Sequence, residues 1–128
     1  MKLKIKITQE VLEATKMCGI DRFILKGSIS FSYSQNCAIT NACRELFPNC
    51  FTLDKIYMIN KYDYRITIAN LPVCATNFID QFDKATSEER VKMKPFEFEI
   101  ELTEEALDLI SIDQITKVLE TSTTLKVV

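Results

Sequence analysis

The chain has 128 residues, a hydrophobic content of 47% and a net charge of −2, which together predict a single folded domain over residues 1–128. An acidic chain lacks the basic surface that non-specific nucleic-acid binding requires. No apolar run approaches the roughly 18 residues of a membrane helix. Histidine is absent, which excludes histidine-ligated zinc and nucleophile–histidine pairs within the chain. We therefore expect no nucleic-acid partner, no membrane, no metal and no cofactor.

The N-terminal residues predict a half-buried strand. Over residues 2–7, lysines alternate with Leu3, Ile5 and Ile7, so the two kinds of side chain lie on opposite faces. This alternation differs from the continuous apolar core of a signal peptide. Free thiols in the reducing cytoplasm are also expected, because the cysteines are odd in number and form no C-x-x-C motif; they are Cys18, Cys37, Cys43, Cys50 and Cys74.

Helices and strands then follow one another along the chain. Thr8 is expected to cap a short helix that ends at Cys18-Gly19. Residues 23–34 suit either an exposed strand or an ordered loop, so this segment stays unplaced. A further helix should begin at Asn36 and stop at Pro48, and residues 50–59 and 64–69 should form a hairpin joined by residues 60–63.

The remaining half is predicted to contain three more helices and two more strands. Asn70-Leu71-Pro72 should open one helix, and residues 84–90 should form a polar loop. The acidic strand 96–102 then leads to Thr103, which can cap another helix. Ser111 and Gln114 match a capping box for a last helix, and residues 124–128 should form an edge strand.

The two end regions share one pattern of strand, threonine cap and helix. Three lysines alternate along residues 2–7 and three glutamates along residues 96–102, so pairing of these strands would place opposite charges across from each other. We expect them to be neighbours with their charges in water. The predicted fold class is α+β: a mixed sheet of four or five strands with helices packed mainly on one face.

Cys37 is the first candidate for chemistry, because a thiol in the first turn of a helix feels the positive end of the helix dipole. The segment Asn36-Cys37-Ala38 resembles the nucleophile region of papain-like and NlpC/P60-like cysteine peptidases. The resemblance breaks at the missing histidine. A thiol-dependent function would require an exposed Cys37 whose pKa is lowered by the helix dipole. The alternative, which we favour, is a buried cysteine that packs in the core.

The cysteines and the alternating glutamates are weak candidates for a metal site. Four of the cysteines could gather around a zinc ion, but they lack the closely paired sequence spacing that zinc sites normally show. Alternating glutamates share a strand face, as a Mg²⁺ site or an acid/base pair would require. A simpler explanation is that these glutamates form a solvent-exposed face and pair with the N-terminal lysines.

Aromatic side chains concentrate around the predicted hairpin and the unplaced segment. Exposed tyrosines are good contact residues because they supply a large area at a small entropy cost. The alternative is that some of them line the core at alternate strand positions. The candidate partner-binding residues are Tyr33, Tyr57, Tyr62 and Tyr64.

Several segments together carry one wider resemblance. They are Ile7-Thr8, Lys16-Met17-Cys18-Gly19, Asn36-Cys37-Ala38-Ile39, Arg44 to Pro48, Leu71-Pro72, Phe78-Ile79, Phe82-Asp83, and Phe96 to Ile100. The chain resembles small uncharacterised proteins encoded by Bacteroidetes and by their phages and mobile elements. The resemblance implies no activity and no catalytic residues, but it suggests an accessory or inhibitory role.

The sequence therefore favours a non-enzymatic protein-interaction module in the cytoplasm, which binds another protein or a second copy of itself. This hypothesis rests on exclusion, since no general base, phosphate loop or metal cluster is evident. The alternative is a thiol-dependent enzyme or redox-sensitive protein that uses Cys37 with Asn36. A small-molecule binding domain is a third hypothesis that the sequence leaves open.

Overall fold

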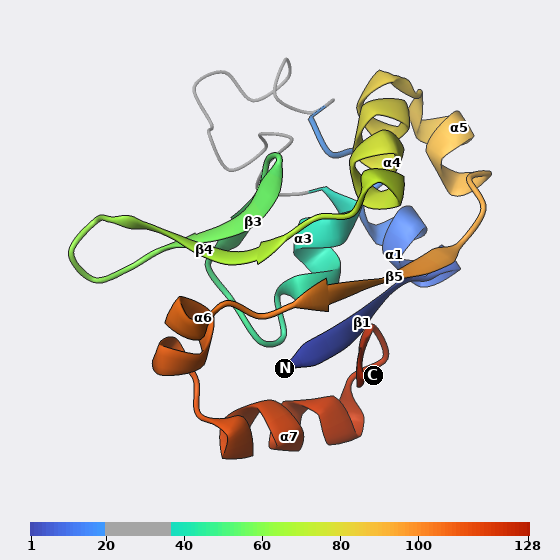
Figure 1. Cartoon of the computed structure of the whole chain (residues 1–128). Coiled ribbons are helices and arrows are strands. Elements are labelled where there is room, and N and C mark those ends of the chain that lie inside the picture. Colours follow the sequence, from blue (N-terminus) through green and yellow to red (C-terminus); the bar gives the residue numbers. More distant parts are fainter. Residues whose placement is uncertain (20–36) are drawn as a thin grey trace.

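A computed structural model describes residues 1–19 and 37–128, so the unplaced segment 23–34, Tyr33 and Asn36 lie outside the described residues. The chain is α+β, as predicted (Figure 1). In chain order the elements are β1 (Lys2–Ile7), α1 (Gln9–Ala14), α3 (Ala38–Cys43), β2 (Cys50–Thr52), β3 (Lys55–Ile59), β4 (Arg65–Asn70), α4 (Val73–Lys84), α5 (Ser87–Val91), β5 (Phe96–Glu101), α6 (Glu104–Leu109), α7 (Ile112–Thr121) and β6 (Leu125–Val127).

The described strands form two antiparallel sheets of three strands each, in the orders β5-β1-β6 and β2-β3-β4. The prediction of one mixed sheet of four or five strands is therefore wrong. The sheets meet at Thr103, whose backbone N–H donates to Ile68 O at 3.0 Å. The Thr103 hydroxyl also donates to Thr67 O at 2.6 Å. These bonds join the sheets at a single residue, without the repeated bonds of a strand ladder.

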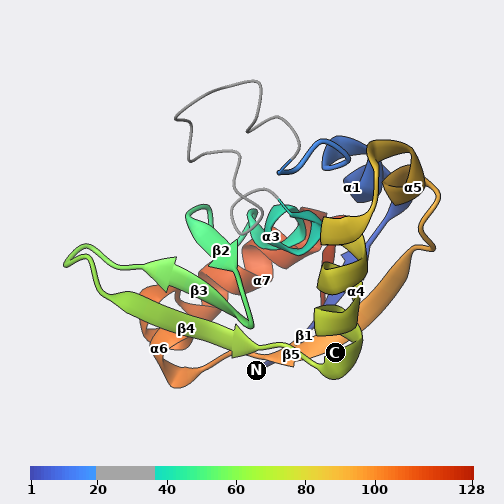
Figure 2. The same cartoon turned by 90° about the horizontal axis from the view of Figure 1, so that it is seen from above.

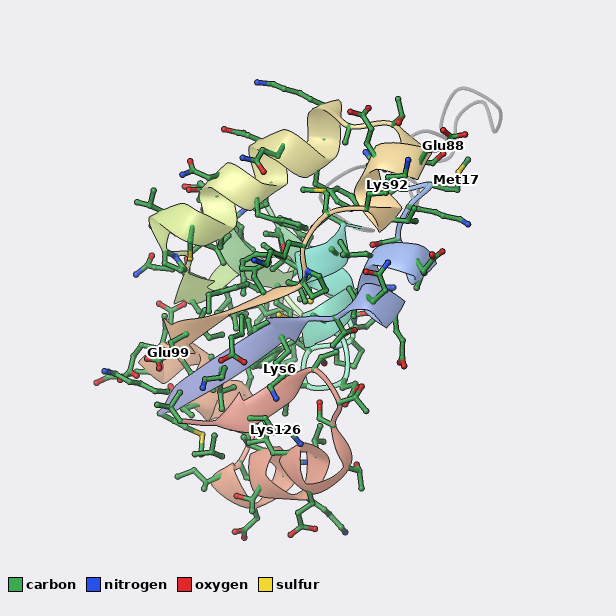
Figure 3. The ribbon with its side chains drawn as sticks, turned by 90° about the vertical axis from the view of Figure 1, so that its right-hand side faces the viewer. Lys6, Met17, Glu88, Lys92, Glu99 and Lys126 are labelled. Carbon is green, nitrogen blue, oxygen red and sulfur yellow. The ribbon has the colours of Figure 1, made fainter. Side chains whose placement is uncertain are left out.

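The predicted pairing of the lysine and glutamate strands is confirmed. β1 and β5 are antiparallel, with Lys2 opposite Glu101, Lys4 opposite Glu99 and Lys6 opposite Glu97. Figure 3 shows the side chains of Lys6, Glu99 and Lys126, one from each strand of this sheet. The glutamates are exposed, and the Lys4 ammonium lies 3.4 Å from a Glu97 carboxylate oxygen. The acidic residues therefore form a solvated face beside the lysines.

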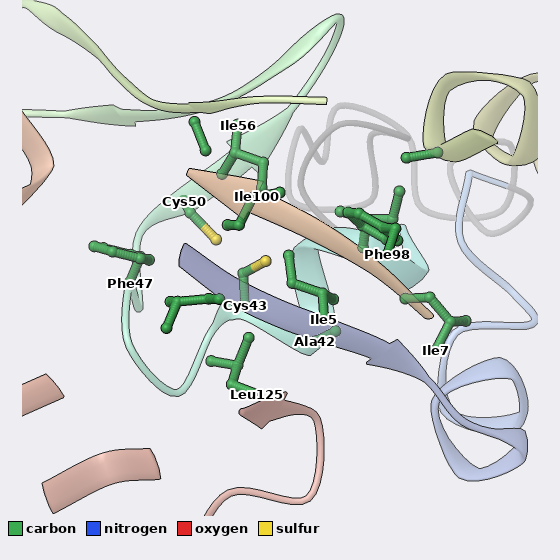
Figure 4. Packing of buried hydrophobic residues seen from close by; sticks show 14 of the residues in the cluster. Ile5, Ile7, Ala42, Cys43, Phe47, Cys50, Ile56, Phe98, Ile100 and Leu125 are labelled. Carbon is green, nitrogen blue, oxygen red and sulfur yellow. The ribbon is translucent and has the colours of Figure 1, made fainter. Parts of the chain in front are cut away.

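The opposite face of this sheet covers the hydrophobic core. Leu3, Ile5 and Ile7 are buried, because successive strand residues point to opposite faces. α3 packs against β1, and Figure 4 shows Ile5, Ala42, Cys43 and Leu125 gathered in this layer. Full burial of each large aliphatic side chain contributes about 1.5–3 kcal/mol. This core fixes the position of α3 and of the segment that leads from it to β2.

Capping residues set the start of several helices. The Thr8 hydroxyl accepts from Val11 N at 3.1 Å, and the Thr103 hydroxyl accepts from Ala106 N at 3.1 Å. Ser111 and Gln114 form the predicted capping box of α7. The predicted loop over residues 84–90 is wrong, because Thr86 and Glu89 form a second capping box that starts α5.

The β3–β4 hairpin and the helix after Pro72 occur as predicted. The strand expected over residues 50–59 is interrupted at Leu53 and Asp54, which turn the chain from β2 into β3. The hairpin end projects away from the body of the molecule, opposite to α4 and α5 (Figure 1, Figure 2). This projection exposes the hairpin turn.

Candidate functional site

The turn of the β3–β4 hairpin is held in one conformation by Asn60. Its side-chain oxygen accepts from Tyr62 N at 2.9 Å and from Tyr64 N at 3.0 Å. Asn60 N also donates to Tyr64 O at 2.9 Å. Asp63 has φ 64°, a left-handed conformation that aspartate tolerates better than most residues. The local sequence Asn60-Lys-Tyr-Asp63 therefore forms a defined turn.

Two of the predicted contact residues extend from this turn into solvent. Tyr62 is 66% exposed and Tyr64 is 69% exposed. The Lys61 ammonium lies 5.1 Å from the centre of the Tyr62 ring, within the range of a cation–π contact. The turn thus presents two aromatic rings and one positive charge at the end of a projecting hairpin.

Tyr57 differs from these two tyrosines, because its side chain is only 8% exposed. Its hydroxyl donates to Asp54 Oδ1 at 2.7 Å, and its ring stacks on Phe51 with 5.5 Å between centroids. The hydrogen bond to Asp54 raises the pKa of Tyr57, and the same bond lowers the pKa of Asp54. The expectation of Tyr57 as an exposed contact residue is therefore wrong. Tyr57 instead packs against Phe51 on the β2–β3–β4 sheet.

Arg65 packs over this aromatic pair. Its guanidinium carbon lies 4.8 Å from the centre of the Tyr57 ring and 5.5 Å from that of Phe51. Arg65 begins β4 directly after the hairpin turn and lies opposite Ile59 in the strand register. The hairpin therefore places the positive charge of Arg65 next to the exposed tyrosines.

A cavity of about 750 Å³ opens between the end of α3 and the β2–β3–β4 sheet. It is lined by Arg44, Pro48, Asn49, Cys50, Phe51, Leu53, Ile59 and Arg65. The size is typical of binding pockets. This cavity has no signature in the sequence, because Arg44 and Arg65 come together only when the α3–β2 segment folds against the hairpin.

Cys37 lies at the start of α3, as predicted, but its side chain is only 4% exposed. Its Sγ accepts from Thr40 N at 3.5 Å and lies 3.3 Å from Thr40 Oγ1. Burial raises the pKa of Cys37, and this effect outweighs the hydrogen bonds that lower it. The favoured prediction of a buried core cysteine is therefore confirmed. The exposed thiol with a lowered pKa, which the thiol-dependent alternative requires, is contradicted, and Asn36 lies outside the described residues.

Two other cysteines lie in the core near Cys37. Burial raises the pKa of Cys43, and it raises the pKa of Cys50 to about 12. The Cys50 thiol donates to Thr40 O at 3.7 Å, and Figure 4 places Cys43 and Cys50 among apolar side chains of the core. In the part of the chain that the structure describes, no three cysteine, aspartate or glutamate side chains could together hold a metal ion.

A fully buried arginine lies at the other end of the molecule. Arg90 in α5 has no exposed surface, and its guanidinium lies 4.1 Å from the centre of the Phe82 ring. Arg90 Nε donates to Phe82 O at 2.8 Å, and Nη1 donates to the carbonyl oxygens of Lys16 and Cys18. These bonds join three segments, so the residue has a structural role. This role of Arg90 was not predicted, because the residue falls in the segment predicted to be a polar loop.

The geometry thus defines a small α+β protein whose candidate site consists of the exposed hairpin turn and the adjacent cavity. Comparisons with models of protein families, with curated proteins and with solved structures found no match. Over residues 1–19 and 37–128, none of the helices is long and apolar enough to cross a bilayer.

Proposed function

We propose that this chain is a non-enzymatic protein-interaction module that binds another protein through its β3–β4 hairpin. The observation that supports this proposal is the pair Tyr62 and Tyr64, both mostly exposed at the end of a projecting hairpin. Tyrosine contributes a large contact area with few rotatable bonds, and it is enriched among residues that dominate binding energies.

The fixed backbone of the turn supports the same proposal. Asn60 holds both tyrosine N–H groups, so the turn loses little conformational freedom on binding. The charge of Lys61 beside Tyr62 gives the surface a polar group next to its apolar area. A surface of this kind can bind a partner without large rearrangement.

The resemblance to proteins of Bacteroidetes and their phages extends the proposal to an accessory or inhibitory protein that acts in the cytoplasm. The thiol-dependent alternative requires a reactive Cys37, and the buried position of that thiol argues against it. The absence of histidine from the sequence further disfavours catalysis by a cysteine–histidine pair.

Site-specific photo-crosslinking in the cells from which the gene comes would test the proposal. A photoreactive phenylalanine analogue replaces Tyr62 or Tyr64 in two variants and Val73 in a matched control. Val73 is 73% exposed, and it begins α4 away from the hairpin turn. We expect one discrete crosslinked protein from positions 62 and 64 that is missing from position 73.

A second measurement separates binding from folding. Tyr62→Ala/Tyr64→Ala should abolish recovery of that protein while the thermal unfolding midpoint changes little, because both rings are exposed. The same crosslinked species from all three positions, or none from positions 62 and 64, would contradict the proposal.

A further inference from the structure

The cavity beside the hairpin contains a preorganised positive charge. Arg65 is exposed, yet its guanidinium packs over the rings of both Phe51 and Tyr57. Packing on two aromatic faces restricts the arginine side chain, so less conformational entropy is lost when it binds a ligand. None of the ion pairs formed by the described residues involves Arg65.

The charged residues that line this cavity in the described part of the chain are both positive. They are Arg44 and Arg65, and the described lining includes neither aspartate nor glutamate. The whole chain, in contrast, has a net charge of −2. A concave surface with two guanidinium groups attracts carboxylates, because guanidinium and carboxylate form paired hydrogen bonds of matching geometry.

Apolar side chains complete the same cavity. Phe51, Leu53 and Ile59 line it together with the two arginines, and Leu53 and Ile59 are substantially exposed. Apolar surface of this kind would be covered by an apolar side chain of a ligand. The lining therefore matches a ligand in which carboxylates and apolar groups alternate.

The cavity is continuous with the hairpin surface. Ile59 and Arg65 lie opposite each other in the strand register and directly flank the turn that carries Tyr62 and Tyr64. A macromolecule that covers the tyrosines therefore extends over the cavity entrance. A small anion would occupy the cavity alone.

From this charge complementarity and continuity, we propose that the cavity binds an acidic segment of the partner protein. A carboxylate of this segment pairs with Arg44 and Arg65, and an adjacent apolar side chain contacts Phe51, Leu53 and Ile59. The inference rests on the proposed function, because it names the chemistry of the partner that the hairpin binds.

Titration of the isotope-labelled protein with two synthetic peptide libraries would test this inference by nuclear magnetic resonance. One library randomises Asp, Glu, Leu and Phe, and the other replaces Asp and Glu by Asn and Gln. We expect the acidic library to shift the amide signals of residues 49–53, 59 and 65, and the amide library to leave them in place. Arg65→Gln and Arg44→Gln should each weaken binding about tenfold, as expected from loss of a charge-assisted hydrogen bond.

Lys117→Gln is the matched control, because it removes the same charge from α7, where residue 117 is exposed. Its binding should equal that of the unmodified protein, and binding of the acidic library should weaken in high salt. The spectrum of each variant without peptide shows whether its fold is kept. Arg65→Lys, which keeps the charge but loses the planar fork, should weaken binding less than Arg65→Gln.

Several outcomes would overturn the inference. They are equal binding of both libraries, shifts outside the cavity, no shifts, and shifts by phenylpropionate alone at the concentration at which the peptides act. The last outcome would assign the cavity to a small carboxylate. A crosslinked partner at position 62 without library binding would overturn only this inference. Failure of the crosslinking would overturn the proposed function, whatever the libraries show.

Discussion

Arg90 Nη1 donates a 2.6 Å hydrogen bond to the carbonyl oxygen of Cys18, 72 residues earlier in the chain. The same nitrogen reaches Lys16 O at 2.9 Å, and Nε reaches Phe82 O at 2.8 Å. Lys16 and Cys18 follow the end of α1, and Phe82 lies in the last turn of α4. Carbonyls at the C-terminal ends of helices carry partial negative charge and favour cations. One side chain thus joins α4 and α5 to the segment that follows α1.

Replacing this arginine should destabilise the protein strongly. Arg90→Lys keeps the charge but cannot reach three carbonyl oxygens in different directions, and we expect it to lower the free energy of unfolding by about 3 kcal/mol. Urea denaturation followed by circular dichroism measures this loss. Arg65→Lys is the control, since Arg65 is exposed and should lose less than about 1 kcal/mol. Equal losses at the two positions would contradict the role assigned to Arg90.

The contribution of Asp83 should lower the stability of the protein as the pH rises, whereas the carboxylate of an ordinary ion pair adds stability as the pH rises. Burial raises the pKa of Asp83 above its usual 3.8, despite the opposing effect of Arg90. Among the described residues, Asp83 Oδ1 and Arg90 Nη2 have no hydrogen-bond partner. Above pH 3.8 the unfolded chain loses the Asp83 proton before the folded chain does, so this group lowers stability as the pH rises through its raised pKa.

Asp83→Asn should remove that contribution. We expect the variant to be more stable than the unmodified protein at neutral pH and the difference to shrink as the pH falls towards 3.8. Denaturation midpoints measured at several pH values test this expectation. Asp80→Asn in the exposed part of α4 serves as the control. A stability difference that is constant over this pH range would show that titration of Asp83 is not its cause.

The thiols should differ sharply in reactivity. Cys74 is exposed, whereas Cys18, Cys37, Cys43 and Cys50 are buried. Because the thiolate is the reactive form, burial protects a thiol both by blocking access and by raising its pKa. We expect one fast reaction with an aromatic disulfide reagent at neutral pH, which Cys74→Ser removes and Cys37→Ser leaves unchanged. A fast reaction at Cys37 would restore the thiol-dependent alternative.

Strand and cap patterns could be predicted from the sequence where local chemistry determines the structure. The strict alternation of residues 2–7 and 96–101 defines two faces, so the pairing of β1 with β5 followed from complementary charges. Ser111 and Gln114 likewise marked the start of α7. The same capping pattern at Thr86 and Glu89 was missed, because the polar composition of that segment suggested a loop.

Properties that depend on long-range packing could not be predicted. The helix dipole at Cys37 is a local feature, but the pKa of this thiol is set mainly by burial, which depends on how α3 packs. Arg90 is buried by segments distant in sequence. The two arginines of the cavity are 21 positions apart, and only the fold of the α3–β2 segment against the hairpin brings them together.

Exchange of the charges of Lys4 and Glu99 should show how strongly charge pairing stabilises the β1–β5 register. These residues are directly opposite each other, so Glu99→Lys places two lysines across the strands and should cost about 0.2–1 kcal/mol. Adding Lys4→Glu restores an opposite pair and places a carboxylate opposite Lys126, its other strand neighbour, but it also removes the Lys4–Glu97 ion pair. The double variant should therefore recover part of the lost stability in urea denaturation.

Salt provides the control for this exchange. The coupling energy from the double-mutant cycle should fall towards zero at 1 M NaCl, where the screening length is about 3 Å. A coupling energy that persists at high salt would come from side-chain packing. If no coupling energy is measured at low salt, the strand pairing depends on the buried faces of the strands alone. In that case Leu3, Ile5 and Ile7, packed against α3, would hold the register that the charges follow.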